Sequence, residues 1–307
     1  MLIVTLALSL VPTPYYVVAP GNAVDLSTRL FVEGRPPPQR RFYLTDVSVV
    51  RASVVLLAAG LWPGVRIVYR DTIVPPGVTA GGFDRLMVDA MGDSQNAAAI
   101  VAERAAGYHV AEPPQSIVVG SVLAASHAAG VLAPGDTIAR VGNVAIRRMT
   151  DLATAFAGVR PGSPVTVGFV RAGRSRSVRI VTIAGPHGAR LGVAVRVLSA
   201  RAQLPVPVRY LMGGIAGSSG GLMFALDIYA GLRPGHARGS VAGTGTIASD
   251  GRVGPIEGVA QKLIAARRVG AELFLVPKEN YASVAHETGI RVVPVATFRE
   301  ALAAIGD

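Results

Sequence analysis

The chain has 307 residues, of which 50% are apolar and 16% charged, a composition that argues against disorder and allows two or three domains with cores of their own. Its net charge of +11 comes from scattered basic residues without a sustained run, which disfavours nucleic-acid binding. There is no cysteine, which excludes disulfides, thiolate nucleophiles and zinc–thiolate sites, and we expect neither a metal nor a cofactor.

The N-terminal stretch carries no charged side chain before Asp25, and its continuous apolar part, Met1–Val11, ends at Pro12. Eleven helical residues rise only about 16 Å, roughly half of a hydrocarbon core of about 30 Å. The stretch is therefore either the outer part of a signal anchor that begins upstream or a short buried segment. We favour the anchor, because no amphipathic pattern is present, and assign residues 1–30 to a membrane-anchor segment with an extended lead-in.

Residues 31–113 read as an α+β region. Phe42–Val55 is rich in β-formers and predicts a strand, whereas Asp84–Ala106 has helical apolar spacing and is followed by Gly107, a typical helix-ending residue.

Residues 114–186 have a different pattern, with short predicted strands and one short helix, which predicts a compact, partly open β-barrel. The predicted strands are Ile117–Val122, Thr137–Val141, Val165–Arg171 and Ser177–Ile183, and the helix is Asp151–Ala157.

Residues 190–307 predict a further α+β domain, so that the whole chain is an α+β multidomain protein. Its strands surround Leu191–Val197, Val206–Met212, Ser240–Ile247 and Leu273–Val276, and its helices are Leu222–Ala230, Gln261–Val269 and Phe298–Ile305.

Ser219 stands in a glycine-rich turn, residues 217–221, directly before a predicted helix. The glycines allow a sharp turn that leaves the hydroxyl accessible, and the helix start offers free N–H groups to a developing oxyanion. Taken alone, the same pattern also fits a serine that only caps the helix.

Lysine usage favours catalysis. Among 30 basic residues only Lys262 and Lys278 are lysine. Arginine stays protonated and cannot act as a general base, whereas a lysine on an apolar helix face can lose its proton. Nearly all neighbours of Lys262 are apolar, a setting that a snorkelling surface lysine, the alternative interpretation, fits less well. Lys278 has the setting of an ordinary loop lysine.

Four ordered segments resemble the Lon protease family. Residues 217–222 (GSSGGL) resemble its G-P-S-A-G-[LI] motif, and residues 251–262 (GRVGPIEGVAQK) resemble G-x-V-x-P-I-G-G-[LI]-x-x-K. Thr244-Gly245 and residues 274–280 (FLVPKEN) match two further elements. The resemblance implies that Ser219 is the nucleophile, Lys262 its general base and Thr244 the partner that orients the amine, with backbone N–H groups near Gly220 holding the oxyanion.

Three positions depart from the family pattern. Ser218 replaces proline and Gly220 replaces alanine, which loosens the turn. Glu257 replaces glycine, and a carboxylate close to Lys262 would raise the pKa of the base.

Residues 130–138 (GVLAPGDTI) resemble a motif of bacterial protease-associated PDZ domains. The resemblance implies capture of polypeptide C-termini at a sheet edge, with Gly107, Tyr108, His109 and Val110 as the carboxylate loop. The alternative is a spacer domain with a vestigial groove.

Residues 14–21 (PYYVVAPG) and 91–95 (MGDSQ), together with the N-terminal apolar segment and the PDZ-like and Lon-like segments, resemble the membrane-anchored YlbL-type PDZ–Lon proteases over essentially the whole chain. That resemblance implies an ATP-independent endopeptidase at the outer face of the cytoplasmic membrane, and it leaves a homo-oligomer open. No G-x-x-x-x-G-K-[ST] loop occurs in the sequence. Two alternatives remain: a catalytically degenerate PDZ adaptor, or a hydrolase using Ser219 with Asp250 and His286.

Overall fold

The computed structural model describes residues 12–74, 78–186, 188–235 and 238–306. They form two compact units. Unit 1 joins the residues up to Val110 to those from Gln203 onward, and unit 2 is Ala111–Ala202. The structure differs here from the predicted boundaries, because the regions predicted at 31–113 and 190–307 share one sheet, and the strand near residue 193 pairs within unit 2.

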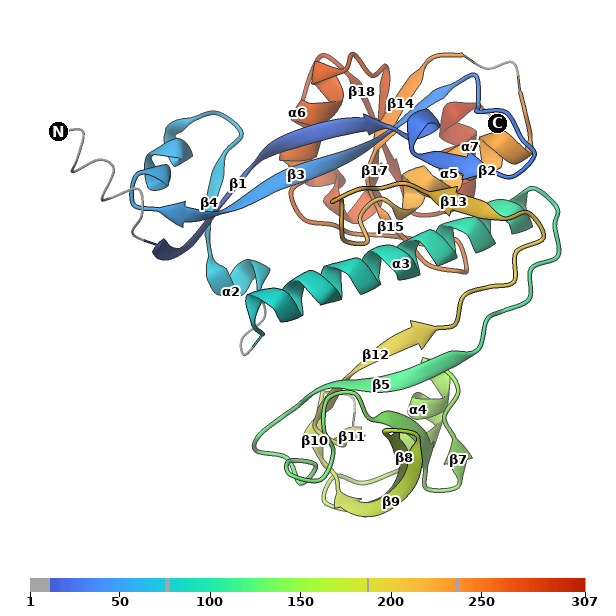
Figure 1. Ribbon diagram of the computed structural model, residues 1–307. Helices are drawn as coiled ribbons and strands as arrows, with labels where there is room; N and C mark the ends of the chain where they lie inside the picture. Colours follow the sequence, from blue (N-terminus) through green and yellow to red (C-terminus); the bar gives the residue numbers. More distant parts are fainter. Residues whose placement is uncertain (1–11, 75–77, 187, 236–237, 307) are drawn as a thin grey trace. The chain divides into compact units, whose positions relative to one another are not determined.

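Unit 1 is built on a mixed sheet of order β18-β17-β14-β3-β1-β4 (Figure 1). β3, β14, β17 and β18 run parallel, and β1 lies antiparallel between β3 and β4. The strands of this sheet are β1 (Pro12–Asp25), β3 (Arg41–Ser53), β4 (Arg66–Tyr69), β14 (Ser240–Gly243), β17 (Leu273–Pro277) and β18 (Arg291–Val295).

Two small ribbons and several helices complete unit 1. The ribbons pair β2 (Leu30–Val32) with β13 (Val208–Tyr210) and β15 (Thr246–Ile247) with β16 (Val253–Gly254). The helices are η1 (Leu26–Thr28), η2 (Leu56–Leu61), α2 (Arg70–Ile73), α3 (Ala80–Ala105), α5 (Gly221–Leu232), α6 (Val259–Arg268), η3 (Lys278–Ser283) and α7 (Phe298–Ile305).

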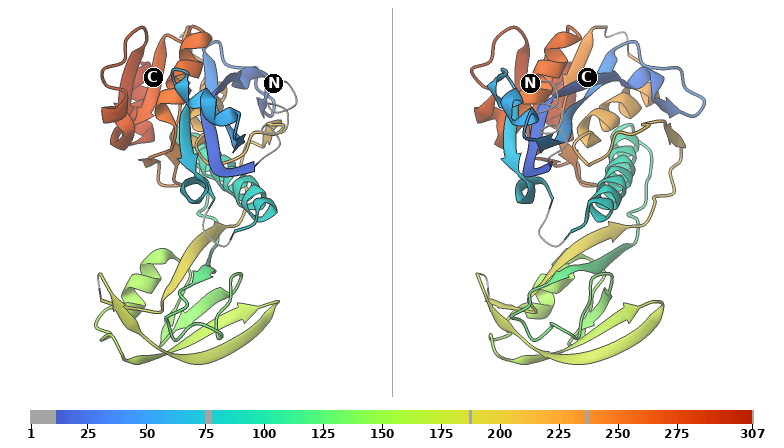
Figure 2. Two further views of the ribbon diagram at one scale, coloured as in Figure 1. Left: turned by 90° about the vertical axis from the view of Figure 1, so that its left-hand side faces the viewer. Right: turned by 60° about the vertical axis from the view of Figure 1, so that its left-hand side comes forward.

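Strand alternation divides the core of unit 1 into two layers. Leu273 and Leu275 of β17 pack in the cluster that contains α3, α5 and α7, whereas Phe274 and Val276 pack in the cluster that contains α6. Successive side chains of a strand point to opposite faces, so α5 and α6 lie on opposite faces of the sheet (Figure 2). α5 is buried nearly all round, which is typical of a central core helix.

Only part of the predicted N-terminal anchor segment lies within the described residues. Residues 1–11 lie outside the described residues, whereas the predicted lead-in from Pro12 is strand β1, which pairs with β3 and β4 and belongs to the sheet of unit 1. Among the described residues, no helix combines the length and the apolar composition needed to cross a bilayer.

Unit 2 is an antiparallel sheet of order β12-β5-β6-β8-β9 with the core expected of a small barrel. β12 is an edge strand of this sheet, which was predicted to belong to the C-terminal domain. The elements are β5 (Gln115–Val122), β6 (Thr137–Val141), β7 (Val144–Ala145), α4 (Met149–Phe156), β8 (Pro164–Arg171), β9 (Arg174–Val181), β10 (Ile183–Gly185), β11 (Gly188–Arg190) and β12 (Val193–Ser199).

Candidate active site

Ser219 lies in the loop that leads into α5, and contacts from two other elements hold this loop. Ser94 of α3 donates its hydroxyl to the carbonyl of Ser218 at 3.0 Å, and the backbone N–H of Gly245 donates to the carbonyl of Ser219 at 2.8 Å. The serine is therefore presented by a fixed backbone rather than by a free loop.

At three positions of this loop a side chain would either collide with a neighbouring residue or require a strained backbone angle, so that glycine is favoured there. Gly217 has a φ of 97°, in the left-handed region. A Cβ on Gly220 would lie 2.6 Å from Leu44 Cδ1, and one on Gly221 would lie 2.7 Å from the Ser94 hydroxyl. Gly220 in place of the family's alanine thus fits the close approach of Leu44.

Lys262 reaches Ser219 from the opposite face of the sheet. Its Nζ lies 2.6 Å from Ser219 Oγ, and the residue is only 2% exposed. Burial lowers the pKa of Lys262 to about 8, since a charged amine loses its hydration there, while the carboxylate of Asp46 acts in the other direction. A large share of the amine is therefore neutral in mildly alkaline solution and able to accept a proton.

Thr244 directs the lone pair of this amine. It stands at the end of the parallel strand β14, where its Oγ1 donates to the carbonyl of Ser219 at 3.1 Å and lies 3.0 Å from Lys262 Nζ. Because the hydroxyl of Thr244 donates its proton to the carbonyl of Ser219, the lone pairs of Oγ1 face Lys262 and accept an N–H from its amine. A neutral amine so held turns its single lone pair toward Ser219 Oγ.

The space in front of Ser219 is a small cavity of about 160 Å³. Its wall includes Leu44 to Val47 from β3 and Gly214 to Gly217 from the loop before the serine. Within the described residues no backbone carbonyl accepts the N–H of Ser219 or Gly220. These two groups, at the start of α5, are suited to hold an oxyanion.

The carboxylate that opposes the base is Asp46, not Glu257. Glu257 is exposed, and the charge that raises the pKa of Lys262 is that of Asp46, which lines the same cavity. The sequence pattern drew attention to Glu257 because it interrupts the lysine motif. Nothing in the motifs marks Asp46, which reaches the site from a strand far away in the chain.

The lysine helix is positioned by its entry loop. Gly258 precedes α6 with a φ of 73°, and a Cβ there would lie 2.8 Å from Val47 Cγ1. Asn280 clamps the same loop: its Oδ1 accepts from the N–H of Ile256 at 2.9 Å, and its Nδ2 donates to the carbonyl of Ile256 at 3.0 Å. These contacts give physical roles to two residues of the resembling motifs.

The alternative triad is not assembled. Asp250 lies in the turn between β15 and β16, where its carboxylate pairs with Arg252 at 2.7 Å. His286 is an exposed residue beyond η3. The basic group in hydrogen-bond distance of Ser219 is Lys262.

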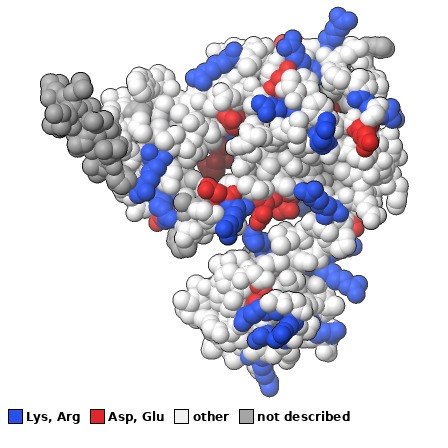
Figure 3. All heavy atoms as spheres, in the orientation of Figure 1, with Lys and Arg blue, Asp and Glu red and all other residues white. Residues whose placement is uncertain are grey.

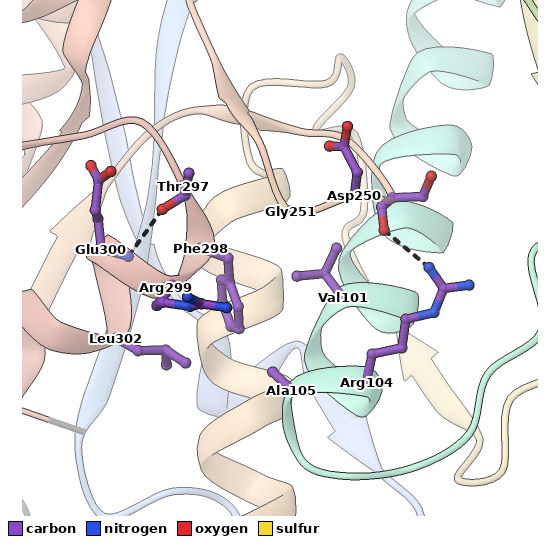
Figure 4. Close-up of a pocket in the computed structure, with 11 residues that line it drawn as sticks. Val101, Arg104, Ala105, Asp250, Gly251, Thr297, Phe298, Arg299, Glu300 and Leu302 are labelled. Atoms are coloured by element: carbon purple, nitrogen blue, oxygen red, sulfur yellow. Dashed lines mark hydrogen bonds between the residues drawn. The ribbon is translucent and has the colours of Figure 1, made fainter.

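Unit 1 also has a larger cavity of about 800 Å³, between α3, the Asp250 turn and the start of α7 (Figure 4). Its polar side chains serve local structure: Arg104 donates to the carbonyl of Ser249 at 3.2 Å, and Thr297 accepts from the N–H of Glu300 at 3.2 Å. This cavity contains none of the groups that surround Ser219.

Unit 2 contributes an apolar groove of about 540 Å³. Its walls are the edge strand β12, the helix α4 and the β10–β11 ribbon. Gly192 (φ 78°) directly precedes β12, and a Cβ there would collide with the Cβ of Ser126. A groove beside an unpaired strand edge can take up an extended peptide.

The predicted carboxylate loop lies elsewhere. Residues 107–110 belong to unit 1, at the end of α3, where Tyr108 packs against the core and the Val110 carbonyl accepts from Arg104. This corrects the prediction: Gly107, Tyr108, His109 and Val110 are part of the helix ending, and the groove is built from residues after position 137. The groove was not predicted from the sequence, because its wall strand β12 follows the other barrel strands in the chain and was assigned to the C-terminal domain.

Known proteins are similar to the C-terminal part of the chain. Residues 213–302 match the model of the Lon protease (S16) C-terminal proteolytic domain. Over 93 residues the chain is 37% identical to Lon protease 2 of Bacillus subtilis and 33% identical to the archaeal Lon protease of Archaeoglobus fulgidus. These matches span 29% of this chain but only 17% and 15% of the relatives, so the chain covers less than a fifth of their length.

Two solved structures are similar to part of this chain. The PDZ domain of an SdrC-like protein from Listeria monocytogenes aligns with 26% of this chain and 85% of its own, at 21% identity and a TM-score of 0.24. A solution structure from Geobacillus thermodenitrificans aligns with 26% of this chain and 94% of its own, at 29% identity and a TM-score of 0.24.

Residues 213–302 thus match a Lon-type proteolytic domain, which is a serine peptidase domain with a Ser–Lys dyad, and Ser219 and Lys262 lie 2.6 Å apart within the matched segment.

Proposed function

We propose that the chain is an ATP-independent serine endopeptidase, and the observation that carries this proposal is the 2.6 Å contact between Ser219 Oγ and the buried Lys262 Nζ. The neutral amine accepts the proton of Ser219 as Oγ attacks the carbonyl carbon of a peptide bond. The N–H groups of Ser219 and Gly220 stabilise the resulting oxyanion.

The remaining steps return the enzyme to its starting state. The protonated Lys262 donates its proton to the leaving amine as the C–N bond breaks, which leaves an acyl ester on Ser219. Lys262 then takes a proton from water, the resulting hydroxide attacks the ester, and the proton returns to Ser219 Oγ as the acid product leaves.

The decisive experiment uses the full chain and a fluorescent casein or peptide substrate. We expect Ser219→Ala and Lys262→Ala to abolish hydrolysis, with losses of at least about a thousandfold. The chain supplies a matched control in its only other lysine: Lys278→Ala, at an exposed position, should hydrolyse at the parental rate. If the parent and both dyad variants are equally silent while folded, the adaptor function replaces this proposal.

We further propose that unit 2 is a PDZ-like module that delivers polypeptides through their C-termini. The unpaired edge of β12 supports this proposal, because an incoming chain can add a strand there. The apolar wall of α4, with Leu152 and Phe156, suits an apolar terminal side chain.

We also propose that the N-terminal stretch places the chain at the outer face of the cytoplasmic membrane. The support is its composition, since residues 1–24 carry no charged side chain. Membrane fractionation of cells that make the full chain, compared with a chain lacking residues 1–11, tests this location: recovery of both forms in the soluble fraction would contradict it.

A further inference from the structure

The outer end of the unit 1 sheet exposes an unusual amount of apolar surface. This end, which we call the outer lobe, comprises residues 12–20 and 48–74: the start of β1, the end of β3, then η2, β4 and α2. Among the described residues sixteen large hydrophobic side chains are exposed, and ten of them lie in the outer lobe. Scattered exposed apolar residues are normal, but a concentration of this kind marks an interaction surface.

Several apolar side chains on one face of the outer lobe are close neighbours. Tyr15 of β1 and Tyr69 of β4 are paired across the strands, with their ring centroids 5.7 Å apart. Val50 and Ile67 flank Val17 on the same face, since both are its cross-strand partners.

The tip of η2 adds the most exposed members. Leu61 is 88% and Trp62 70% exposed, and a Cβ on the preceding Gly60 would lie 2.6 Å from Ile67 Cδ1. Leu61 and Trp62 therefore extend the surface formed by β3, β1 and β4, so that strands and η2 present one apolar patch.

Charge on the outer lobe is sparse and mainly positive. It carries Arg51, Arg66 and Arg70 against a single acidic residue, Asp71, which pairs with Arg70 at 3.4 Å. In Figure 3 the lobe is the largely white end of the molecule, with a few basic side chains on it. Tyrosine and tryptophan rings next to arginines are the composition favoured where a protein surface meets the headgroups of a bilayer.

We propose that the outer lobe is a peripheral membrane-docking surface, which inserts Leu61 and Trp62 between the lipids of an anionic bilayer. Two features favour lipid over a protein partner. The excess of arginine complements anionic headgroups, and the uncharged residues 1–11 join the chain at the start of β1, within the same lobe.

Docking would also fix the catalytic helix relative to the bilayer. Gln261 of α6 donates through Nε2 to the carbonyl of Gly64 at 3.0 Å, and this turn follows Trp62 directly. The residue next to the general base is thus attached to the lobe that meets the membrane. The proposal concerns a surface distinct from the dyad and does not depend on peptidase activity.

Trp62 is the only tryptophan of the chain, so its fluorescence reports on this surface alone. With the full chain and vesicles of phosphatidylcholine and phosphatidylglycerol, we expect the emission to shift to shorter wavelength and to be quenched by lipids brominated in their acyl chains. Leu61→Ser keeps the probe and should weaken vesicle binding about tenfold, as expected for one leucine side chain no longer buried. Leu211→Ser, at a leucine 50% exposed outside the lobe, is the matched control and should bind like the parent.

Three results would overturn the proposal. Vesicles that bind the chain while Trp62 emission stays that of a solvated ring would assign binding to the N-terminal residues alone. Equal vesicle affinity of Leu61→Ser and the parent would remove the lobe from the contact. A blue shift that grows with protein concentration in the absence of lipid would make the surface a contact between copies of this chain.

Discussion

Two factors with opposite effects, burial and a nearby carboxylate, set the pKa of Lys262. Burial lowers the pKa of Lys262 to about 8, and the negative charge of Asp46 raises it. Only the neutral amine can accept the Ser219 proton, so kcat/KM should rise with pH, with a midpoint near 8, and level off above it. Asp46→Asn removes the charge that favours the protonated amine and should move the rise to lower pH.

A pH–rate profile of the parent and of Asp46→Asn checks this prediction. Glu257→Gln is the control, because the exposed Glu257 does not set the pKa of Lys262 and its profile should coincide with that of the parent. A profile that moves with Glu257→Gln and stays in place with Asp46→Asn would reverse the assignment.

Thr244 is predicted to act by orienting the base rather than by filling space. Thr244→Val keeps the shape of a fully buried residue but removes the oxygen that lies 3.0 Å from Lys262 Nζ. We expect kcat to fall about ten- to a hundredfold, the equivalent of one buried hydrogen bond of about 1–3 kcal/mol. Thr244→Ser retains the hydroxyl and should have most of the parental rate. Equal rates for Thr244→Val and Thr244→Ser would show that Thr244 does not orient the amine of Lys262.

Helix α5 carries the nucleophile at its start and a buried carboxyl group in its middle. Asp227 is 2% exposed, and its Oδ1 has no hydrogen-bond partner among the described residues. Burial, with a smaller contribution from Asp25, raises the pKa of Asp227 to about 8. The folded state thus holds a proton that the unfolded chain releases above about pH 4.

This proton makes stability depend on pH. Because the folded pKa lies above the unfolded one, the free energy of unfolding should fall as pH rises from about 4 to about 8. Asp227→Asn cannot ionise and should unfold at a higher temperature than the parent at pH 9, by several degrees, with a clearly smaller difference at pH 5. Thermal melts at both pH values test this, with Asp84→Asn, an exposed aspartate of α3, as the control that should melt like the parent.

Elements with a strong local signal were predicted from the sequence. The helices α3, α5 and α7 were predicted within a few residues of their observed bounds, because apolar residues recur with helical spacing and glycine or a capping residue marks an end. The dyad was predicted for the same reason: its glycine turn, its rare lysine and the spacing of its motifs are local features.

Pairing between distant segments could not be predicted in this way. β1 was taken for a lead-in to an anchor, because an uncharged, proline-containing stretch does not reveal that its partners are β3 and β4. β12 was assigned to the wrong unit, and Asp46 was missed, for the related reason that a strand's neighbours are set by the whole sheet rather than by its own residues.

At the scale of the whole molecule, unit 2 is an insertion between two parts of one sheet. Every strand of the unit 1 sheet comes from residues 12–69 or 240–295. Where the chain enters and leaves unit 2, Gln115 is paired with Ser199, and the N–H of Ala200 donates to the carbonyl of Pro114 at 2.9 Å. A few glycine and serine residues can therefore replace residues 115–199 without stretching unit 1.

We expect this shortened chain to fold and to cleave short peptides at a rate near that of the full chain, because the dyad and its cavity lie within unit 1. If unit 2 delivers polypeptides through their C-termini, the KM for a longer substrate with an apolar C-terminal residue should rise about tenfold or more while kcat is kept. Ala153→Arg, which places a charged side chain in the groove, should reproduce this change in the full chain, and Ala145→Arg, at an exposed position outside the groove, should not. An unchanged KM in both the shortened chain and Ala153→Arg would make unit 2 a spacer, since an occupied groove must contribute to affinity.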